Sequence, residues 1–228
     1  MKVACIIPSR GRPAQLRRCI DLFFETTQEH DVECLAIIDG DVEPYYQALT
    51  DSAAMLLDGN DAVFNPKQVG AVASWNIGLK ALAYANAFIP GADDLIWHPG
   101  WLDAALAALQ TLPGGQGMVG FNDLDRTDHM ATHFLVTRQC IIEVMGGVLA
   151  IPAYHHYWTD PEMNVRAKIE GCYVWCEESV VEHRSSMNGK APEDDTYRLA
   201  RKYFKADEET FNRRQAAGFP NDFEPVLR

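Results

Sequence analysis

The sequence predicts an α/β fold whose sheet is parallel in its first half, and three observations support this. Short apolar runs alternate along the chain with amphipathic helical stripes, as they do in β-α-β units. Polar residues follow directly after several of the apolar runs, where open α/β sheets place their binding sites. The 228 residues are 47% hydrophobic and 23% charged, which suits a globular chain with a sizeable core.

The first elements follow this alternation. Residues 2–8 (KVACIIP) form a short apolar run that predicts a buried strand. Apolar side chains then recur at helical spacing over residues 16–24, so a helix should begin near Pro13. Residues 32–38 (VECLAII) predict a second buried strand, and a polar, partly helical stretch follows to about Leu57.

The rest of the chain continues the pattern with shorter elements. Residues 69–87 are rich in Ala, Leu and Ile and predict a second long helix. Residues 87–92 predict a strand that is short or at an edge, because Pro90 cannot donate a ladder hydrogen bond. The other expected elements are strands at 62–64, 118–121, 134–136, 173–175 and 179–182 and helices at 101–112, 160–170 and 194–204.

We expect one domain, residues 1–184, followed by a C-terminal helical and polar segment, residues 185–228. The chain has 20 Lys and Arg against 32 Asp and Glu, a net charge of −12. Because this surplus repels phosphate backbones, we expect no nucleic-acid partner. No apolar run approaches the roughly 18 residues of a membrane span, and the cysteines form no disulfide pattern. A reduced, cytoplasmic protein without a transmembrane segment is therefore expected.

Three common catalytic or nucleotide-binding motifs are missing from the sequence. It contains no GxxxxGK[ST] loop, no GxGxxG turn opening the first helix and no GxSxG elbow. The turn after the first strand instead reads SRGRP. The candidates for chemistry are then the polar residues at the predicted strand ends, namely Arg10, Arg12, Asp39, Asp93 and Asp94.

The order of these segments resembles the GT-A glycosyltransferases, in particular their large family 2-like group. The resemblance covers about residues 2–185 and rests on VACIIPSRGRP, LAIIDGD, QVGAVASWNIGLKAL and GADDLIWHPGWL. It implies the GT-A fold, a mixed, mostly parallel sheet flanked by helices that binds a nucleoside diphosphate sugar. It also implies a divalent metal, Mn²⁺ or Mg²⁺, and an inverting transfer of the sugar to the hydroxyl of an unknown acceptor, a glycan or a small molecule.

The resemblance also implies which residues bind the nucleotide. The matching residues are Pro8, Ser9 and Arg10 after the first strand, Asp39 after the second, and Gly70 and Asn76 near the diphosphate. Two of these assignments have ordinary alternatives. Asp39 precedes a glycine, as turn aspartates often do, and Arg10 with Arg12 also fits a solvated loop.

The metal ligands implied by the resemblance are Asp93 and His183. Asp93 matches the last Asp of the metal-binding DxD motif, which also contacts the nucleotide, but Gly91 stands in place of the first Asp. Trp75 stands where many relatives have Arg. His183 ends the run SVVEH, where relatives often have a metal-binding His, and a structural His is an equal alternative. The DxD string at residues 123–125 is a weaker metal candidate that fits the acceptor side.

Asp160 and Glu162 are the candidate catalytic bases. An inverting transfer needs a carboxylate that accepts the proton of the acceptor hydroxyl as the bond forms. Relatives place an Asp or Glu before this helix, after an aromatic segment, which here is Tyr157-Trp158. Asp160 is the first choice and Glu162 the second. Acidic residues at a helix N-terminus are also favoured by the helix dipole, so a purely structural role stays open for both.

Two other functions are compatible with this sequence. A sugar nucleotidyltransferase usually has a Gly-rich loop that ends in Lys or Arg after the first strand, whereas the PSRGRP loop has a single Gly. A non-catalytic carbohydrate- or nucleotide-binding module is the second alternative, and Gly91 and Trp75 favour it mildly. Turnover of a nucleotide sugar with and without metal distinguishes all three functions.

Overall fold

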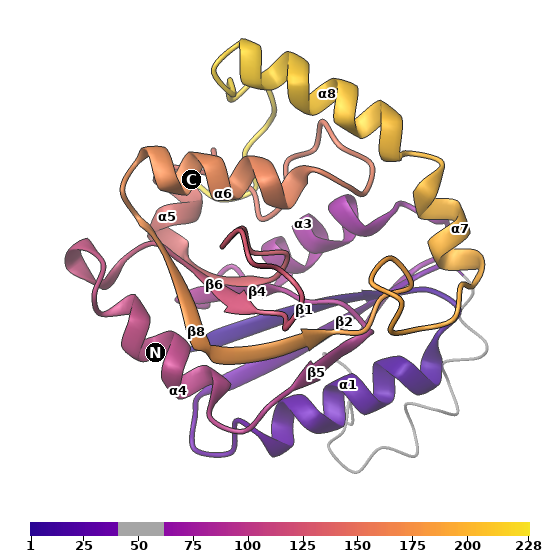
Figure 1. Cartoon of the computed structure of the whole chain (residues 1–228), viewed down its shortest axis with the longest axis horizontal. Helices are drawn as coiled ribbons and strands as arrows, with labels where there is room; N and C mark the ends of the chain where they lie inside the picture. Colours follow the sequence, from indigo (N-terminus) through magenta and orange to yellow (C-terminus); the bar gives the residue numbers. More distant parts are fainter. Residues whose placement is uncertain (41–61) are drawn as a thin grey trace.

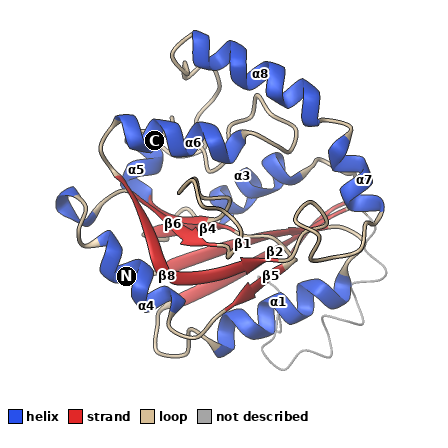
Figure 2. Ribbon diagram, viewed as in Figure 1, coloured by secondary structure: helices blue, strands red, loops and turns tan. Residues whose placement is uncertain are grey.

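A computed structural model describes residues 1–40 and 62–228 of the chain, and its described part contains an eight-stranded sheet with helices on both faces (Figure 1, Figure 2). The polar stretch expected over residues 41–57 lies outside the described residues. The strands are β1 (Val3–Ser9), β2 (Val32–Asp39), β3 (Ala62–Asn65), β4 (Ala87–Pro90), β5 (Leu95–Trp97), β6 (Met118–Asn122), β7 (Phe134–Thr137) and β8 (Tyr173–His183).

The sheet is mixed and mostly parallel, which confirms the predicted fold class. Its strand order is β3-β2-β1-β4-β7-β6-β8-β5. β1 pairs in parallel with β2 and β4, and β2 pairs in parallel with β3. β7 runs antiparallel to both β4 and β6, and β5 runs antiparallel to β8. The parallel half therefore brings the carboxyl ends of β1, β2 and β4 to one edge.

Helices cover both faces of the sheet. They are α1 (Pro13–Glu25), α3 (Ala71–Ala81), α4 (Trp101–Leu109), α5 (Arg138–Glu143), α6 (Thr159–Ile169), α7 (Asp195–Arg201) and α8 (Phe204–Ala216), with a 3₁₀ turn at Pro113–Gly115. Successive side chains of a strand point to opposite faces. Cys5 and Ile7 of β1 accordingly pack in the core layer with α1 and α4, whereas Ala4 and Ile6 pack in the layer with α3, α5 and α6.

The C-terminal segment packs against the rest of the chain. It contains two helices, α7 and α8, where the sequence predicted one over residues 194–204. Phe211, Phe219 and Leu227 are buried in the same core layer as α6. Backbone N–H groups of Val226 and Leu227 also donate to the carbonyl of Gly147. No helix within residues 1–40 and 62–228 has the length and apolar character needed to cross a membrane.

Several expected elements differ from those observed. β4 lies inside the sheet between β1 and β7, so the edge alternative is wrong; Pro90 is tolerated because it is the last residue of the strand. The expected strands at 173–175 and 179–182 are one strand, β8, with a register shift against Phe121 and Asn122. Neither β5 nor α5 was expected, because three and six residues are too few for a periodic signal.

Candidate active site

A pocket of about 540 Å³ opens at the carboxyl ends of β1, β2 and β4. This is where open α/β sheets bind their ligands. The end of β8, the start of α6 and the α7–α8 corner complete its lining. Among the residues predicted from the sequence, the lining includes Pro8, Ser9, Arg10, Asp39, Gly70, Asp93, Asp160 and His183.

Asp93 is held by two side chains, one at the end of β1 and one in the loop that follows it. The hydroxyl of Ser9 donates to its Oδ2 atom at 2.6 Å, and Nη1 of Arg12 donates to its Oδ1 atom at 3.0 Å. Burial and the adjacent Asp94 carboxylate raise the pKa of Asp93. Arg12 also binds Asp194, the N-cap residue of α7, through two hydrogen bonds of 2.7 and 2.9 Å. The guanidinium of Arg12 is thus the positive charge that pairs with Asp93.

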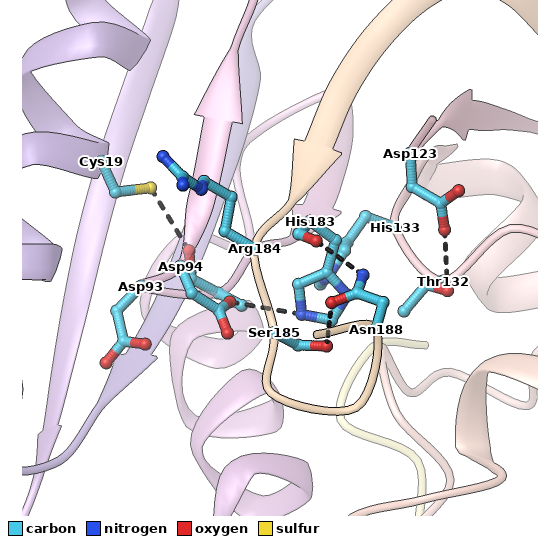
Figure 3. Close-up of polar contacts among 12 residues, drawn as sticks. Cys19, Asp93, Asp94, Asp123, Thr132, His133, His183, Arg184, Ser185 and Asn188 are labelled. Carbon is cyan, nitrogen blue, oxygen red and sulfur yellow. Dashed lines mark hydrogen bonds and ion pairs between the residues drawn. The ribbon is translucent and has the colours of Figure 1, made fainter. Parts of the chain in front are cut away.

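Asp94, rather than Asp93, is the partner of His183 (Figure 3). β5 pairs with β8 so that Leu95 lies opposite His183, and Nε2 of His183 lies 3.3 Å from Oδ1 of Asp94. Tyr197 donates its hydroxyl to the Oδ2 atom of Asp94 at 2.7 Å. Burial opposes ionisation of this carboxyl, but His183 and Tyr197 outweigh it and lower the pKa of Asp94. No sequence pattern indicates this pairing, because the three residues of β5 are too few for a periodic signal.

His133 is a second imidazole beside His183 that sequence reasoning missed. The two rings lie 4.8 Å apart, and Nδ1 of His133 is 2.9 Å from the carbonyl oxygen of Pro90 (Figure 3). Burial lowers the pKa of His133 to about 4, so the ring is neutral near pH 7. A single His ahead of an apolar strand carries no sequence signal that separates it from a structural residue.

These side chains offer a divalent cation a partial set of ligands. Within the described residues, no three or more His, Cys, Asp or Glu side chains gather as a complete metal site. Two buried polar atoms of this site are not fully satisfied: Nε2 of His133 has no hydrogen-bond partner in the described residues, and Oδ1 of Asp94 has only the 3.3 Å ion pair with His183. Mg²⁺ typically takes one or two carboxylates and completes its shell with substrate phosphates and water. The donors present therefore fit a metal that is shared with a phosphate ligand.

Packing explains why a glycine replaces the first Asp of the DxD motif. A Cβ atom on Gly91 would lie 2.9 Å from Sγ of Cys5 and 3.0 Å from Cγ1 of Ile7. The carbonyl of Gly91 also accepts a hydrogen bond of 2.9 Å from the indole of Trp75. The backbone after β4 therefore runs too close to β1 for any side chain, and the two departures from the family pattern, at positions 75 and 91, contact each other.

Asp39 holds the loop that leads into α3. Its carboxylate accepts hydrogen bonds from the backbone N–H groups of Val69, at 2.7 Å, and Gly70, at 2.8 Å. Gly70 adopts a positive φ of 88°, which a residue with a side chain rarely adopts. Both residues line the pocket. A contact between Asp39 and a nucleotide base stays a prediction. The geometry shows that Asp39 holds the loop before α3.

Asn76 is placed differently from its predicted role near the diphosphate. It is not among the residues that line the pocket. Its Oδ1 atom accepts from the N–H groups of Leu149 and Ala150, at 2.9 and 3.2 Å, and its Nδ2 atom donates to the carbonyl of Ala150 at 2.7 Å. The Asn76 amide thus braces the chain after α5 against α3, and its place near the diphosphate stays a prediction.

Asp160 lies in the first turn of α6 and lines the pocket. The turn before it is set by Trp158, which has a positive φ of 69°. Burial raises the pKa of Asp160 to about 6, and the positive charges of Arg126 and His183 oppose this shift only in part. A carboxyl with a pKa near neutrality is well suited to exchange a proton with a ligand.

Glu162 points away from the pocket, and the structure does not support it as a base. Its side chain is fully buried and accepts hydrogen bonds from Arg166, Arg214 and the hydroxyl of Tyr154, at 2.6 to 3.1 Å. Burial opposes ionisation, but the guanidinium groups and the hydroxyl prevail and lower the pKa of Glu162. Because Arg214 belongs to α8, this carboxylate fastens the C-terminal segment to α6.

The chain is similar to known proteins in structure but not in sequence. No protein-family model and no curated protein matches its sequence. In structure it is similar to a mannosyltransferase from Pyrobaculum calidifontis in complex with GDP-Man and Mn²⁺, with a TM-score of 0.66 and 13% identity. The alignment covers 92% of this chain and 64% of the mannosyltransferase, so the chain spans only that share of its length.

Two further similar structures are sugar-phosphoglycerate synthases. The mannosyl-3-phosphoglycerate synthase from Rubrobacter xylanophilus has a TM-score of 0.64 and 11% identity, covering 100% of this chain and 79% of the other. The glucosyl-3-phosphoglycerate synthase from Mycobacterium tuberculosis, in complex with Mn²⁺, UDP and glucosyl-3-phosphoglycerate, has a TM-score of 0.61 and 14% identity. It is covered over 79% of its length, against 92% of this chain.

These similarities show the class of fold. The described chain has the fold of the GT-A glycosyltransferases, as the sequence resemblance predicted.

Proposed function

We propose that this protein is a metal-dependent, inverting glycosyltransferase that moves a sugar from a nucleoside diphosphate sugar to an acceptor hydroxyl. One observation carries the proposal: the Asp94–His183 pair and the Asp160 carboxyl line the same pocket on a GT-A sheet. Two of the similar structures contain GDP-Man or UDP together with Mn²⁺, and this supports the proposed donor class. The six free cysteines are consistent with a reducing, cytoplasmic location.

The donor side of the pocket, as we define it, comprises the ends of β1, β2 and β4 with the acid pair Asp93–Asp94. Arg10 lines this side, and in the described part of the chain no carboxylate pairs with it. A guanidinium is suited to bind phosphate oxygens through parallel hydrogen bonds. We therefore assign Arg10 to the diphosphate and the loop of Pro8 and Ser9 to the nucleotide.

We assign the divalent cation, Mn²⁺ or Mg²⁺, to Asp94 and His183, with His133 as the neighbouring imidazole. This assignment differs from the sequence expectation in that Asp93 is engaged by Arg12 and Ser9. When bound, such a cation neutralises negative charge that develops on the departing diphosphate. Asp93 would position the guanidinium of Arg12, which also forms ion pairs with Asp94 and with Asp194 at the start of α7.

The acceptor side comprises the start of α6, the residues around Asp123 and the α7–α8 corner. The oxygen of the acceptor hydroxyl forms a bond to the anomeric carbon of the sugar. The bond from that carbon to the diphosphate breaks, and the diphosphate leaves with the electron pair. Asp160 takes the hydroxyl proton, and attack opposite to the leaving group inverts the configuration. The ionised form of Asp160 is the active one.

A turnover assay tests this function against the two alternatives. Purified protein is incubated with UDP-glucose, UDP-galactose and GDP-mannose, with Mn²⁺ or with chelator, and release of nucleoside diphosphate is measured. We expect release from one donor that depends on the metal and falls in Asp160→Asn. Binding without release would favour the non-catalytic module. Formation of a nucleotide sugar from a sugar phosphate and a nucleoside triphosphate would favour the nucleotidyltransferase.

A further inference from the structure

The acceptor side of the pocket has a wall of aromatic rings contributed by two segments that are distant in sequence. Tyr157 and Trp158 precede α6, while Tyr203 and Phe204 form the α7–α8 corner, and all four line the pocket. We call these four residues the aromatic wall. Tyr203 and Phe204 remain 36% and 38% exposed. Large apolar rings left open beside a pocket indicate a surface that a ligand covers.

Three rings of the wall pack on one another, and the fourth, Tyr203, packs on His155. The ring centroids of Tyr157 and Phe204 lie 5.1 Å apart, and those of Trp158 and Phe204 lie 6.0 Å apart. Tyr203 stacks at 4.6 Å and 4° on His155, which also lines the pocket. The indole N–H of Trp158 is buried without a hydrogen-bond partner in the described residues, and a ligand hydroxyl can accept from such a group.

Asp207 of α8 fixes the first half of the wall. It is fully buried, and its Oδ2 atom accepts from the backbone N–H groups of His156 and Tyr157, both at 2.9 Å. Its Oδ1 atom lies 3.0 Å from the backbone nitrogen and 3.0 Å from Nδ1 of His155. Because one carboxylate ties down three consecutive residues, the wall needs little ordering when a ligand binds, and this favours affinity.

The charges around the wall disfavour an anionic acceptor. Three carboxylates line this side of the pocket, those of Asp123, Asp125 and Asp160. The nearby guanidinium of Arg126 is bound by Asp128 through two hydrogen bonds of 3.0 and 2.6 Å. Lys190 is likewise paired, at 2.9 Å, with Asp125. A phosphate or carboxylate group beside these residues would therefore meet like charges. Lys202 and Lys205 flank Tyr203 and Phe204 in sequence, but they are exposed and are not among the residues that line the pocket.

We propose that the acceptor is an uncharged sugar or glycoside whose ring stacks on the aromatic wall while one of its hydroxyls faces Asp160. The apolar C–H face of a sugar ring packs on aromatic rings, and its hydroxyls bind the surrounding carboxylates. The proposal rests on the proposed function and adds the class of acceptor to it. The hydroxyl oxygen forms the new bond to the donor sugar, its proton passes to Asp160, and nucleoside diphosphate departs.

Calorimetric titration of acceptors provides the test. The protein, alone and loaded with UDP or GDP and Mn²⁺, is titrated with p-nitrophenyl glucoside, galactoside and mannoside and with 3-phosphoglycerate. We expect at least one glycoside to bind about tenfold more tightly than 3-phosphoglycerate, a ratio that corresponds to about 1.4 kcal/mol. Equal or tighter binding of 3-phosphoglycerate, or no binding of any glycoside, would overturn the proposal.

Three variants connect the binding to the wall. Tyr203→Ala and Phe204→Leu should each weaken glycoside binding by roughly three- to tenfold, because each removes one ring from the stacking surface. Tyr84→Ala, at a tyrosine that is 57% exposed and outside the pocket lining, is the matched control and should leave the affinity unchanged. Phe204→Leu retains apolar volume against Trp158, so the fold should persist. Wild-type glycoside affinity in both wall variants would contradict the proposal.

The same titrations test the proposed function and the acceptor class separately. Nucleoside diphosphate affinity should be the same in the wall variants as in the wild type, because the wall is outside the donor side. If neither UDP nor GDP binds but the glycosides do, the proposed function fails while the acceptor surface stands. If the nucleotide binds and the glycosides do not, only the acceptor class is wrong.

Discussion

The donor and acceptor sides of the pocket are built in different ways. The donor side stands on residues at or just after the carboxyl ends of parallel strands, such as Ser9, Asp39 and Asp93, so the apolar run before each residue predicts its position. The acceptor side depends on residues that meet across more than forty positions of sequence, such as His155 with Asp207 and Glu162 with Arg214. One side follows from sheet topology, whereas the other depends on where the C-terminal segment docks.

This difference explains why two neighbouring carboxylates have different roles. Asp160 and Glu162 are two residues apart on α6, yet one lines the pocket and the other is buried beneath α8. The pKa of Asp160 is raised to about 6 by burial, while that of Glu162 is lowered by its partners, chiefly Arg214, against the opposing effect of burial. Position near a helix N-terminus is therefore a weak guide to function, and long-range partners decide the role.

The largest expected effect on activity belongs to Asp160. Asp160→Asn removes the proton acceptor but keeps the shape of the side chain, so transfer should fall by roughly two to four decades. Nucleoside diphosphate affinity, measured by calorimetry, should remain within about twofold of wild type. The control is Asp103→Asn, at a side chain that is 76% exposed on α4. Near wild-type transfer by Asp160→Asn would show that the acceptor side does not contain the base.

The largest expected effect on stability belongs to Glu162. Glu162→Gln leaves Arg166 and Arg214 without their buried counter-charge, and breaking such a pair typically costs about 3–5 kcal/mol. Chemical denaturation measures the loss, and Glu170→Gln, at an exposed residue at the end of the same helix, should change little. Because the folded-state pKa of Glu162 is lowered, the stability from this network is present above its unfolded pKa and is lost as pH falls through the folded value.

A smaller, selective effect is expected at Asp207, which positions the acceptor side through the 155–157 loop. Asp207→Asn replaces one acceptor oxygen by a donor that faces backbone N–H groups. The KM for the acceptor should rise roughly tenfold, about the loss of one charge-assisted hydrogen bond, while the KM for the donor stays constant. Asp195→Asn, at a side chain that is 90% exposed on α7, is the control. An equal rise in both KM values would remove the distinction between the two sides.

The smallest predicted effect is a pH dependence that belongs to the acceptor side. Since Asp160 acts in its ionised form and its pKa is raised to about 6, kcat/KM should be constant above that pH and decrease below it. At pH 5 the decrease should be about tenfold, the ionised fraction one unit below the pKa. Arg126 and His183 are the positive charges that face this carboxyl and limit the shift. A flat profile from pH 8 to 5 would contradict the assignment.

The sequence predicted which strand-end residues line the donor side, and the reason is physical. Continuous apolar runs such as 32–38 can be buried only as strands, and the polar residue that follows each run must lie at the edge of the sheet. The positions of Ser9, Asp39 and Asp93 in the pocket lining follow from this. Sequence reasoning failed for His133, Asp94 as the partner of His183, and Asp207, because each depends on pairings that local patterns do not encode.

The two departures from the family pattern also show that local sequence does not reveal contacts between distant residues. Gly91 and Trp75 each suggested, from sequence, a weakened site. In the structure the two residues form a hydrogen bond, and Gly91 is required by the close approach to Cys5 and Ile7. The packing between β1 and the end of β4 explains both residues.

The most direct test of the central claim is metal-dependent nucleotide binding at Asp94. UDP, GDP, CDP and ADP are titrated calorimetrically into the wild type, Asp94→Ala and Asp160→Asn, each with Mn²⁺ and with chelator. We predict that one diphosphate binds the wild type and Asp160→Asn at least tenfold more tightly with Mn²⁺, and that Asp94→Ala loses this dependence. Equal affinity with and without metal in the wild type, or no binding of any of the four, would contradict the account.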